Sequence, residues 1–156
     1  MSGVTSYEKA LEIAGQIVFT VKGISMRPLF HADTDAIVVR KCKPDELKNL
    51  DIVLHTRPSP QGKQYVLHRI VGRKPNGDFI IAGDNCVTYD IVPPADILGI
   101  TVSAQRRNTP IKLSGTKYEL YTRLWCKPYK MRFVVLGCRN IAKRIIGKTL
   151  RLLHLR

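Results

Sequence analysis

The chain has 156 residues and a net charge of +14, with 44% hydrophobic and 24% charged residues. This length supports one domain with a real core, and this balance of apolar and charged residues excludes a disordered chain. The charge is uneven, because residues 117–156 carry eleven Lys or Arg against one acid, Glu119. We therefore expect a nearly balanced body over residues 1–116 and a basic tail over residues 117–156.

The body is predicted to be mainly β. A short amphipathic helix is expected over residues 6–14, with Ser6 as its cap and Gly15 as its end. Residues 16–21 are β-branched and aromatic and predict a strand that delivers Ser25 at its end. Further strands are predicted at 35–41, 50–56, 64–73, 79–82 and 97–104, with a loop at 58–62 and a hairpin turn at 75–78. Short strands separated by Gly and Pro turns favour an open coiled β-sheet or barrel.

The tail is predicted to be helical, with one segment over residues 118–125 and a second over 133–155. On one side of the second segment lie Val134, Cys138, Ile141, Ile145 and Leu152, and mostly on the other lie Arg139, Lys143, Lys148 and Arg151. That pattern is typical of a basic amphipathic helix. It allows three interpretations: docking on an anionic membrane surface, packing of the apolar face on the body, or binding of an acidic partner such as a negatively charged leader peptide or nucleic acid. Because the body lacks regularly spaced stacking aromatics, we do not expect nucleic acid.

Several classes of protein are not expected from the pattern. The four cysteines form no Cys-x-x-Cys pair and have no histidine at metal-ligand spacing, so we expect reduced thiols, no metal and no cofactor. The longest uncharged N-terminal run, residues 13–21, is far shorter than the roughly 20 residues of a membrane-spanning helix. No signal-peptide pattern opens the chain. We therefore expect a cytoplasmic protein or one held peripherally at a membrane.

Residues that fit nucleophilic catalysis occur in two segments. Ser25 lies within Val21-Lys22-Gly23-Ile24-Ser25-Met26-Arg27-Pro28, and His68 lies within Leu67-His68-Arg69-Ile70. A serine hydroxyl needs a base within hydrogen-bond reach and usually a third group that orients the base. An imidazole can accept the serine proton near neutral pH without large tuning of its pKa. His55 is the rival base, whereas His31 and His154 are weaker candidates.

Four segments taken in order resemble the type I signal peptidase family. They are Gly-x-Ser-Met-x-Pro at 23–28, Asp51-Ile52-Val53, His68-Arg69-Ile70 and Gly83-Asp84-Asn85. The match covers roughly residues 17–103 and is nearest to the endoplasmic-reticulum and archaeal branch, in which a histidine replaces the lysine base. The Gly-x-Ser-Met start followed by Asp35-Ala36-Ile37-Val38-Val39 is also similar to the LexA-type self-cleaving repressors of the same superfamily. Unlike most members of the signal peptidase family, the chain shows no transmembrane helix before the serine.

The resemblance implies roles for individual residues. Ser25 would be the nucleophile and His68 the general base. Asp90, at the spacing of a second aspartate in the endoplasmic-reticulum enzymes, is the favoured partner of His68, and Asp84 is the alternative. The Ser25 amide would serve as an oxyanion donor, while Gly23, Ile24 and Met26 would form the oxyanion and substrate-binding region, with Met26 as a floor. Many signal peptidases carry a serine at the position of Gly23, so a second oxyanion donor must come from elsewhere.

The leading hypothesis is a serine endopeptidase that cuts a leader or signal segment from a precursor peptide or protein. By resemblance, the substrate would lie extended against a strand edge with small side chains before the cut. One alternative is a LexA-like regulator that cleaves itself, which is disfavoured because no helix-turn-helix segment precedes the serine. The other is a non-catalytic basic module that binds a membrane or nucleic acid.

Overall fold

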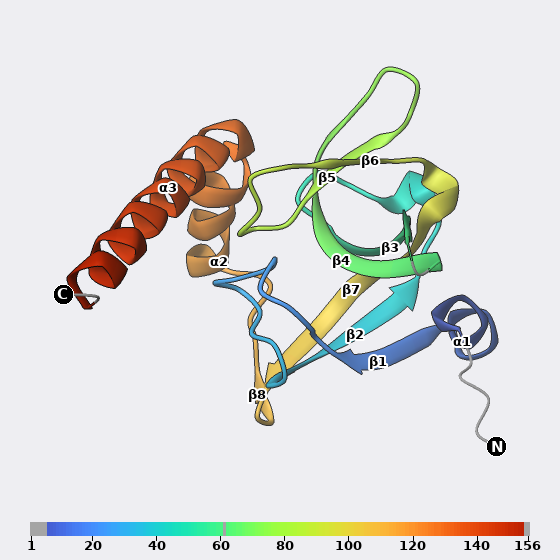
Figure 1. Cartoon of the computed structure of the whole chain (residues 1–156). Helices are drawn as coiled ribbons and strands as arrows, with labels where there is room; N and C mark the ends of the chain where they lie inside the picture. The colour runs from blue at the N-terminus through green and yellow to red at the C-terminus, as the bar shows by residue number, and fades with distance from the viewer. Residues whose placement is uncertain (1–5, 61, 155–156) are drawn as a thin grey trace.

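One open antiparallel sheet dominates the computed structural model, which describes residues 6–60 and 62–154 (Figure 1). The order of its strands is β1-β2-β7-β3-β4-β5-β6, and β8 pairs with β7 outside this path. The predicted class, a mainly β open sheet with a short N-terminal helix and a C-terminal helical region, is confirmed. The strands are β1 (Gln16–Thr20), β2 (Asp35–Lys41), β3 (Ile52–Ser59), β4 (Gly62–Arg73), β5 (Phe79–Ala82), β6 (Asp90–Val92), β7 (Ile97–Arg106) and β8 (Thr109–Pro110).

The helices begin and end where local chemistry favours it. In α1 (Tyr7–Ala14), the Ser6 side chain accepts a hydrogen bond from the Lys9 amide, and Gly15 ends the helix with a left-handed φ of 70°. Two 3-10 turns, η1 (Pro44–Glu46) and η2 (Pro94–Asp96), each begin at a proline. The chain then forms α2 (Thr116–Tyr121), the π-helical turn η3 (Thr122–Cys126) and α3 (Tyr129–His154).

Three local features differ from the sequence prediction. The loop expected at 58–62 is shorter, because Pro58 and Ser59 still pair with Lys63 and Gly62 in the β3–β4 hairpin. Pro58 is tolerated there because β3 pairs with β7 only at residues 53–55, so the other edge at Pro58 needs no donor. The short strands β6 and β8 were not predicted, since neither is long enough to show a period-two pattern.

Two apolar clusters support the sheet and leave the site between them. The first lies under α1 and the segment that carries Ser25, and it includes Leu11, Met26 and Phe30. The second includes Val53, Ile70, Phe79 and Ile81 from β3, β4 and β5. Neighbouring residues of β3 enter different clusters because successive side chains of a strand point to opposite faces.

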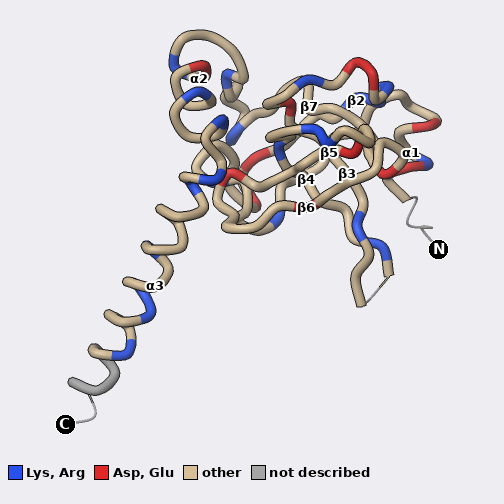
Figure 2. The backbone as a smooth tube through the Cα atoms, turned by 90° about the horizontal axis from the view of Figure 1, so that it is seen from above, with Lys and Arg blue, Asp and Glu red and all other residues tan. Residues whose placement is uncertain are grey.

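Helix α3 extends away from the sheet and carries many Lys and Arg residues along its length (Figures 1 and 2). Arg132 and Leu136 near its start are 2% and 1% exposed, and Arg139 bonds to Asn85. Tyr129 and Phe133 pack against Tyr89 of the body. The apolar side chains of the helix are not packed on the sheet: Val134, Ile141 and Ile145 are 58–66% exposed. No helix among the described residues combines the length and the apolar character that crossing a bilayer requires.

Candidate active site

Ser25 lies in a loop that is fixed from below. After β1, the Val21 amide donates to Asp35 and the Val21 carbonyl accepts from Asp33, so the loop leaves the sheet at a defined point. Met26 and Phe30, at 1% and 0% exposure, anchor the loop in the first apolar cluster. Ser25 itself is half-buried and faces a cavity. The Ser25 loop is thus anchored by backbone hydrogen bonds of Val21 and by the buried side chains of Met26 and Phe30.

The Ser25 loop is also fixed from above by Asn85. The Asn85 amide donates to the Ser25 carbonyl at 2.7 Å, and its side-chain amide donates to the Ile24 carbonyl at 3.1 Å. The other end of that side chain accepts a hydrogen bond from Arg139 of α3 at 2.9 Å. Sequence reasoning assigned no role to Asn85 or Arg139, and only the position of Asn85 in the Gly83-Asp84-Asn85 motif could have pointed to it.

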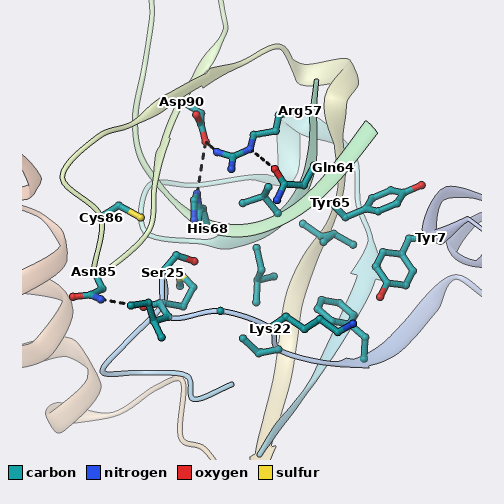
Figure 3. Close-up of a pocket in the computed structure, with 18 of the residues that line it drawn as sticks. Tyr7, Lys22, Ser25, Arg57, Gln64, Tyr65, His68, Asn85, Cys86 and Asp90 are labelled. Atoms are coloured by element: carbon teal, nitrogen blue, oxygen red, sulfur yellow. Dashed lines mark hydrogen bonds and ion pairs between the residues drawn. The ribbon is translucent and has the colours of Figure 1, made fainter. Parts of the chain in front are cut away.

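His68 lies on β4 with its two ring nitrogens in different surroundings (Figure 3). Its Nδ1 is 3.8 Å from a carboxylate oxygen of Asp90, and the ring is 6% exposed. Its Nε2 lies near Gly83, on the side of Gly83 that also faces the Ser25 carbonyl. Among the described residues the Ser25 hydroxyl makes no hydrogen bond to His68. In serine hydrolases this contact is often long in the free enzyme and shortens when substrate binds.

Gly83 allows this close approach. A Cβ atom at Gly83 would lie 2.7 Å from the Ser25 carbonyl oxygen, 2.9 Å from His68 Nε2 and 2.7 Å from the Cys86 sulfur. Real Cβ atoms do not tolerate such distances to backbone. The glycine of the Gly83-Asp84-Asn85 motif therefore lets the Ser25 carbonyl, His68 Nε2 and Cys86 all lie close to its backbone.

Gly23 contributes in another way. Its φ of 78° is in the left-handed region, and a Cβ there would meet nothing within 4 Å. The conformation, not the space, therefore requires glycine. Gly23, Ile24 and Met26, the predicted oxyanion and substrate-binding residues, all line the same cavity as Ser25.

The charges around His68 set its pKa. Burial by itself lowers the pKa of His68, but interactions with Asp90 and Cys86 outweigh burial and raise the pKa above its ordinary value of 6.5. Asp90 responds in the opposite sense, because contact with His68 and the charge of Arg57 outweigh its partial burial and lower its pKa. At neutral pH Asp90 is ionised and therefore suited to orient the imidazole.

Asp90 also faces the cationic side chain of Arg57. It is the first residue of β6, its side chain is 32% exposed, and Arg57 lies 3.4 Å from the same carboxylate oxygen that faces His68. Arg57 is itself held by Gln64 at 3.0 Å. Asp90 is thus shared between a base and a permanent charge, and neither Arg57 nor Gln64 was singled out by the sequence.

Asp84 does not reach His68. Its two carboxylate oxygens receive two hydrogen bonds from Arg69, at 2.9 and 2.7 Å, and one from Tyr121 at 2.8 Å. Asp84 and Arg69 are both fully buried. Because Arg69 and Tyr121 occupy the acceptors of Asp84, the structure favours Asp90 over Asp84 as the partner of His68.

The Asp84–Arg69 pair instead joins the helical region to the sheet. Tyr118 accepts from Arg69, the Trp125 indole donates to the Asp84 carbonyl at 2.9 Å, and Arg132 donates to the Gly83 carbonyl at 3.2 Å. Residues from α2, η3 and α3 therefore surround one buried carboxylate. The first part of the basic region is packed into the body, and only the later turns of α3 are free of it.

A cavity of about 780 Å³ unites the candidate residues (Figure 3). Ser25, His68 and Asp90 line one end, and Tyr7, Phe19 and Tyr65 line the other. His55, the rival base, is fully buried and does not line this cavity. His31 does not line it either. The side chain of His154, the remaining candidate, lies outside the described residues. Cys86 lines the cavity beside His68 and was not predicted there.

Comparison of the chain with protein-family models, with curated proteins and with solved structures found no match. The four motifs and the geometry around them therefore carry the functional argument.

Proposed function

We propose that this chain is a serine endopeptidase of the signal-peptidase type, with Ser25 as nucleophile, His68 as general base and Asp90 as the group that orients His68. One observation carries the proposal: three segments distant in sequence bring these residues to one end of a single cavity. His68 turns Nδ1 toward a carboxylate and Nε2 toward the serine segment, which is the polarity that a triad requires.

In this mechanism His68 Nε2 accepts the Ser25 proton as the hydroxyl oxygen attacks the scissile carbonyl carbon. The imidazolium that forms is stabilised by ionised Asp90, and it returns the proton to the leaving amine. The Ser25 amide is the expected donor to the oxyanion. Water then attacks the acyl carbon while His68 again accepts the proton. The acyl product leaves, and the proton returns to the Ser25 oxygen.

The cavity suits an extended peptide. β4 pairs with β5 only from Arg69 onward, so residues 63–68 keep one unpaired backbone edge on the cavity. Residues 20–25 line the opposite wall. A peptide laid between these two backbones can add hydrogen bonds to the sheet, as in strand-addition recognition. We propose that the substrate is the leader or signal segment of a precursor.

The test is cleavage of a complex peptide mixture by the full chain, followed by mass spectrometry. The wild type should produce new termini with a common sequence preference, and Ser25→Ala should reduce cleavage to background with an unchanged circular dichroism spectrum. Ser103→Ala, at an exposed site on β7, is the matched control and should be fully active. A fully active Ser25→Ala protein would refute the proposal, and an active His68→Ala protein would reassign the base to His55.

We further propose that the enzyme works at an anionic membrane surface, held there by α3. The apolar stripe of α3, which is 54–70% exposed, consists of Met131, Val134, Val135, Ile141, Ile145 and Ile146. Its members follow the three- and four-residue spacing of one helix face. Arg132, Leu136 and Arg139, which contact the body, form a different row of α3, as do Tyr129 and Phe133, which pack against Tyr89.

Charge favours lipid as the occupant of this stripe. Exposed Lys130, Lys143, Arg144 and Lys148 accompany it, and Glu119 is the last acid in the chain. Anionic headgroups match these cations while acyl chains match the stripe, each Lys or Arg contributing about 1 kcal/mol near such a surface. An acidic protein partner would match the cations but would leave the stripe exposed.

Vesicle flotation of the full chain measures this interaction. The protein should float with vesicles containing phosphatidylglycerol, less with phosphatidylcholine alone, and less at high salt. The double variant Ile141→Gln and Ile145→Gln should weaken binding about tenfold or more, because two side chains lose apolar burial. Ile13→Gln with Val18→Gln, at exposed apolar sites on α1 and β1, is the matched control. Equal flotation of all three proteins would exclude α3 as the anchor.

A further inference from the structure

Two buried ring nitrogens near the candidate triad have no hydrogen-bond partner in the described part of the chain. They are Nε2 of His55 and Nδ1 of His68. His55 is fully buried and His68 is 6% exposed. Buried polar atoms in folded proteins nearly always have a partner. Two such lone nitrogens side by side indicate a ligand that both could share.

The sheet register places the two imidazoles together. Val53 pairs with His68 and His55 pairs with Val66, so the histidines are diagonal neighbours on one face of the β3–β4 ladder. Their ring centroids are 6.0 Å apart. Asp90 approaches from β6, and one donor atom from each of the three residues lies within 4.8 Å of the others.

The hydrogen bond between His55 Nδ1 and the Thr56 carbonyl determines which ring nitrogen of His55 carries the lone pair. His55 Nδ1 lies 3.2 Å from the Thr56 carbonyl, which can only accept, so the proton is on Nδ1 and Nε2 carries a lone pair. Metal-binding histidines usually donate their other ring N–H to a carbonyl or carboxylate in this way.

We propose that His55 Nε2, His68 Nδ1 and a carboxylate oxygen of Asp90 form a binding site for a divalent transition-metal ion, with Zn²⁺ as the best fit. Two imidazoles and one carboxylate favour zinc over magnesium or calcium, which prefer all-oxygen sites. A tetrahedral zinc ion with bonds of about 2.0–2.1 Å needs donors about 3.3 Å apart. His68 Nδ1 and the Asp90 oxygen are 3.8 Å apart and all three donor atoms lie within 4.8 Å of one another, so the site must contract by up to about 1.5 Å to hold the ion.

Asp90 is the ligand that can move to close the site. It is at the start of the three-residue strand β6 and is 32% exposed, whereas both histidines are fixed on long paired strands. Arg57 competes for the same carboxylate oxygen at 3.4 Å and must release it when the ion binds.

Metal binding would switch off the peptidase proposed above, and this consequence depends on that proposal. A neutral imidazole that coordinates through Nδ1 carries its proton on Nε2. His68 Nε2 then has no lone pair for the Ser25 proton, and Asp90 is no longer free to stabilise an imidazolium. The same two residues cannot serve the ion and the catalytic step at once, so zinc acts as a reversible inhibitor.

Binding is tested without any activity measurement, by calorimetric titration of the full chain with Zn²⁺ and by the visible spectrum of the Co²⁺ form. The wild type should bind one ion, with a Co²⁺ spectrum free of thiolate charge-transfer bands. His55→Gln should weaken zinc binding by about 100-fold or more, beyond the effect usual for residues behind the ligands. His31→Gln, a histidine outside the cluster, should bind like the wild type.

Because His55 is fully buried, Asp90→Asn provides a second ligand-removal variant at a less buried position. Unchanged zinc affinity in both His55→Gln and Asp90→Asn would overturn the site, as would a Co²⁺ spectrum dominated by thiolate ligands. Cleavage by the wild type should stop when the site is saturated with zinc and return with a chelator. Cleavage that continues at saturation overturns the inhibition, whereas zinc binding by a chain that cleaves no peptide refutes only the peptidase.

Discussion

Asp84 follows β5 and Asp90 begins β6, yet the two aspartates lie in opposite environments. Asp84 is fully buried and saturated by Arg69 and Tyr121, and three helical segments are arranged around it. Asp90 is one-third exposed and faces His68 at 3.8 Å. The comparison teaches that a carboxylate whose acceptors are all engaged supports the fold, while one with a loosely held oxygen is available for chemistry.

The largest expected effect is on the fold, from Asp84→Asn. A neutral amide leaves the buried Arg69 charge uncompensated, which should lower the free energy of unfolding by about 3–5 kcal/mol. Chemical denaturation measures it, with exposed Asp45→Asn as a control that should change stability by less than about 0.5 kcal/mol. A stable Asp84→Asn protein that had lost only activity would return Asp84 to the site.

The Asp84–Arg69 pair explains why the helical region from Thr116 onward cannot be deleted without damage to the body. A chain shortened at Thr116 would lose Tyr118, Tyr121, Trp125 and Arg132 from around Asp84 and Arg69. Substitutions on the outer stripe of α3 leave this buried centre intact and are the cleaner test of membrane docking.

Asp90→Asn should spare the fold and damage the reaction. Removal of the charge that stabilises the imidazolium should lower kcat by about 100-fold. The pH profile gives a sharper reading. The base must be neutral, so wild-type activity should rise with pH through a pKa above 6.5, because Asp90 and Cys86 raise the pKa of His68. In Asp90→Asn this limb should move to lower pH, and an unmoved limb would contradict the pairing of Asp90 with His68.

Gly83→Ala tests the close packing around Gly83, which lies next to Asp84 in the chain. The new methyl group would press on the Ser25 carbonyl, His68 Nε2 and Cys86. We expect a loss of about 1–3 kcal/mol in stability from overpacking and reduced kcat/KM, measured by denaturation and peptide cleavage. Gly137→Ala, where a Cβ meets nothing within 4 Å in α3, is the matched control and should be neutral or stabilising.

The smallest effect is expected from Arg57→Gln. Without Arg57 the Asp90 carboxylate faces only His68 and Asp90 loses one cause of its lowered pKa. The acidic limb of the activity profile should then move to higher pH, opposite to the direction in Asp90→Asn. Lys112→Gln, an exposed change on the segment after β8, should leave the limb in place. A shift to lower pH in Arg57→Gln would show that Arg57 supports the triad instead of competing for Asp90.

The sequence by itself determined the local features of this protein. Ser6 and Gly15 mark the ends of α1, and the alternating apolar residues of β2 mark a strand with one buried face. The Ser25 and His68 motifs named these two residues as candidates for a nucleophile and a base. These features depend on caps, turn residues and side-chain period, all of which act between near neighbours in the chain.

Only the tertiary structure decided which aspartate meets His68, and that His55 lies beside it. The resemblance favoured Asp90 but left Asp84 open, because what separates the two is burial of Asp84 beside Arg69, a residue of another strand. His55 joins His68 only through the register of β3 against β4, and β6 exists only because β5 offers it an edge. Such choices depend on long-range pairing and on competition for hydrogen-bond partners, which no local pattern encodes.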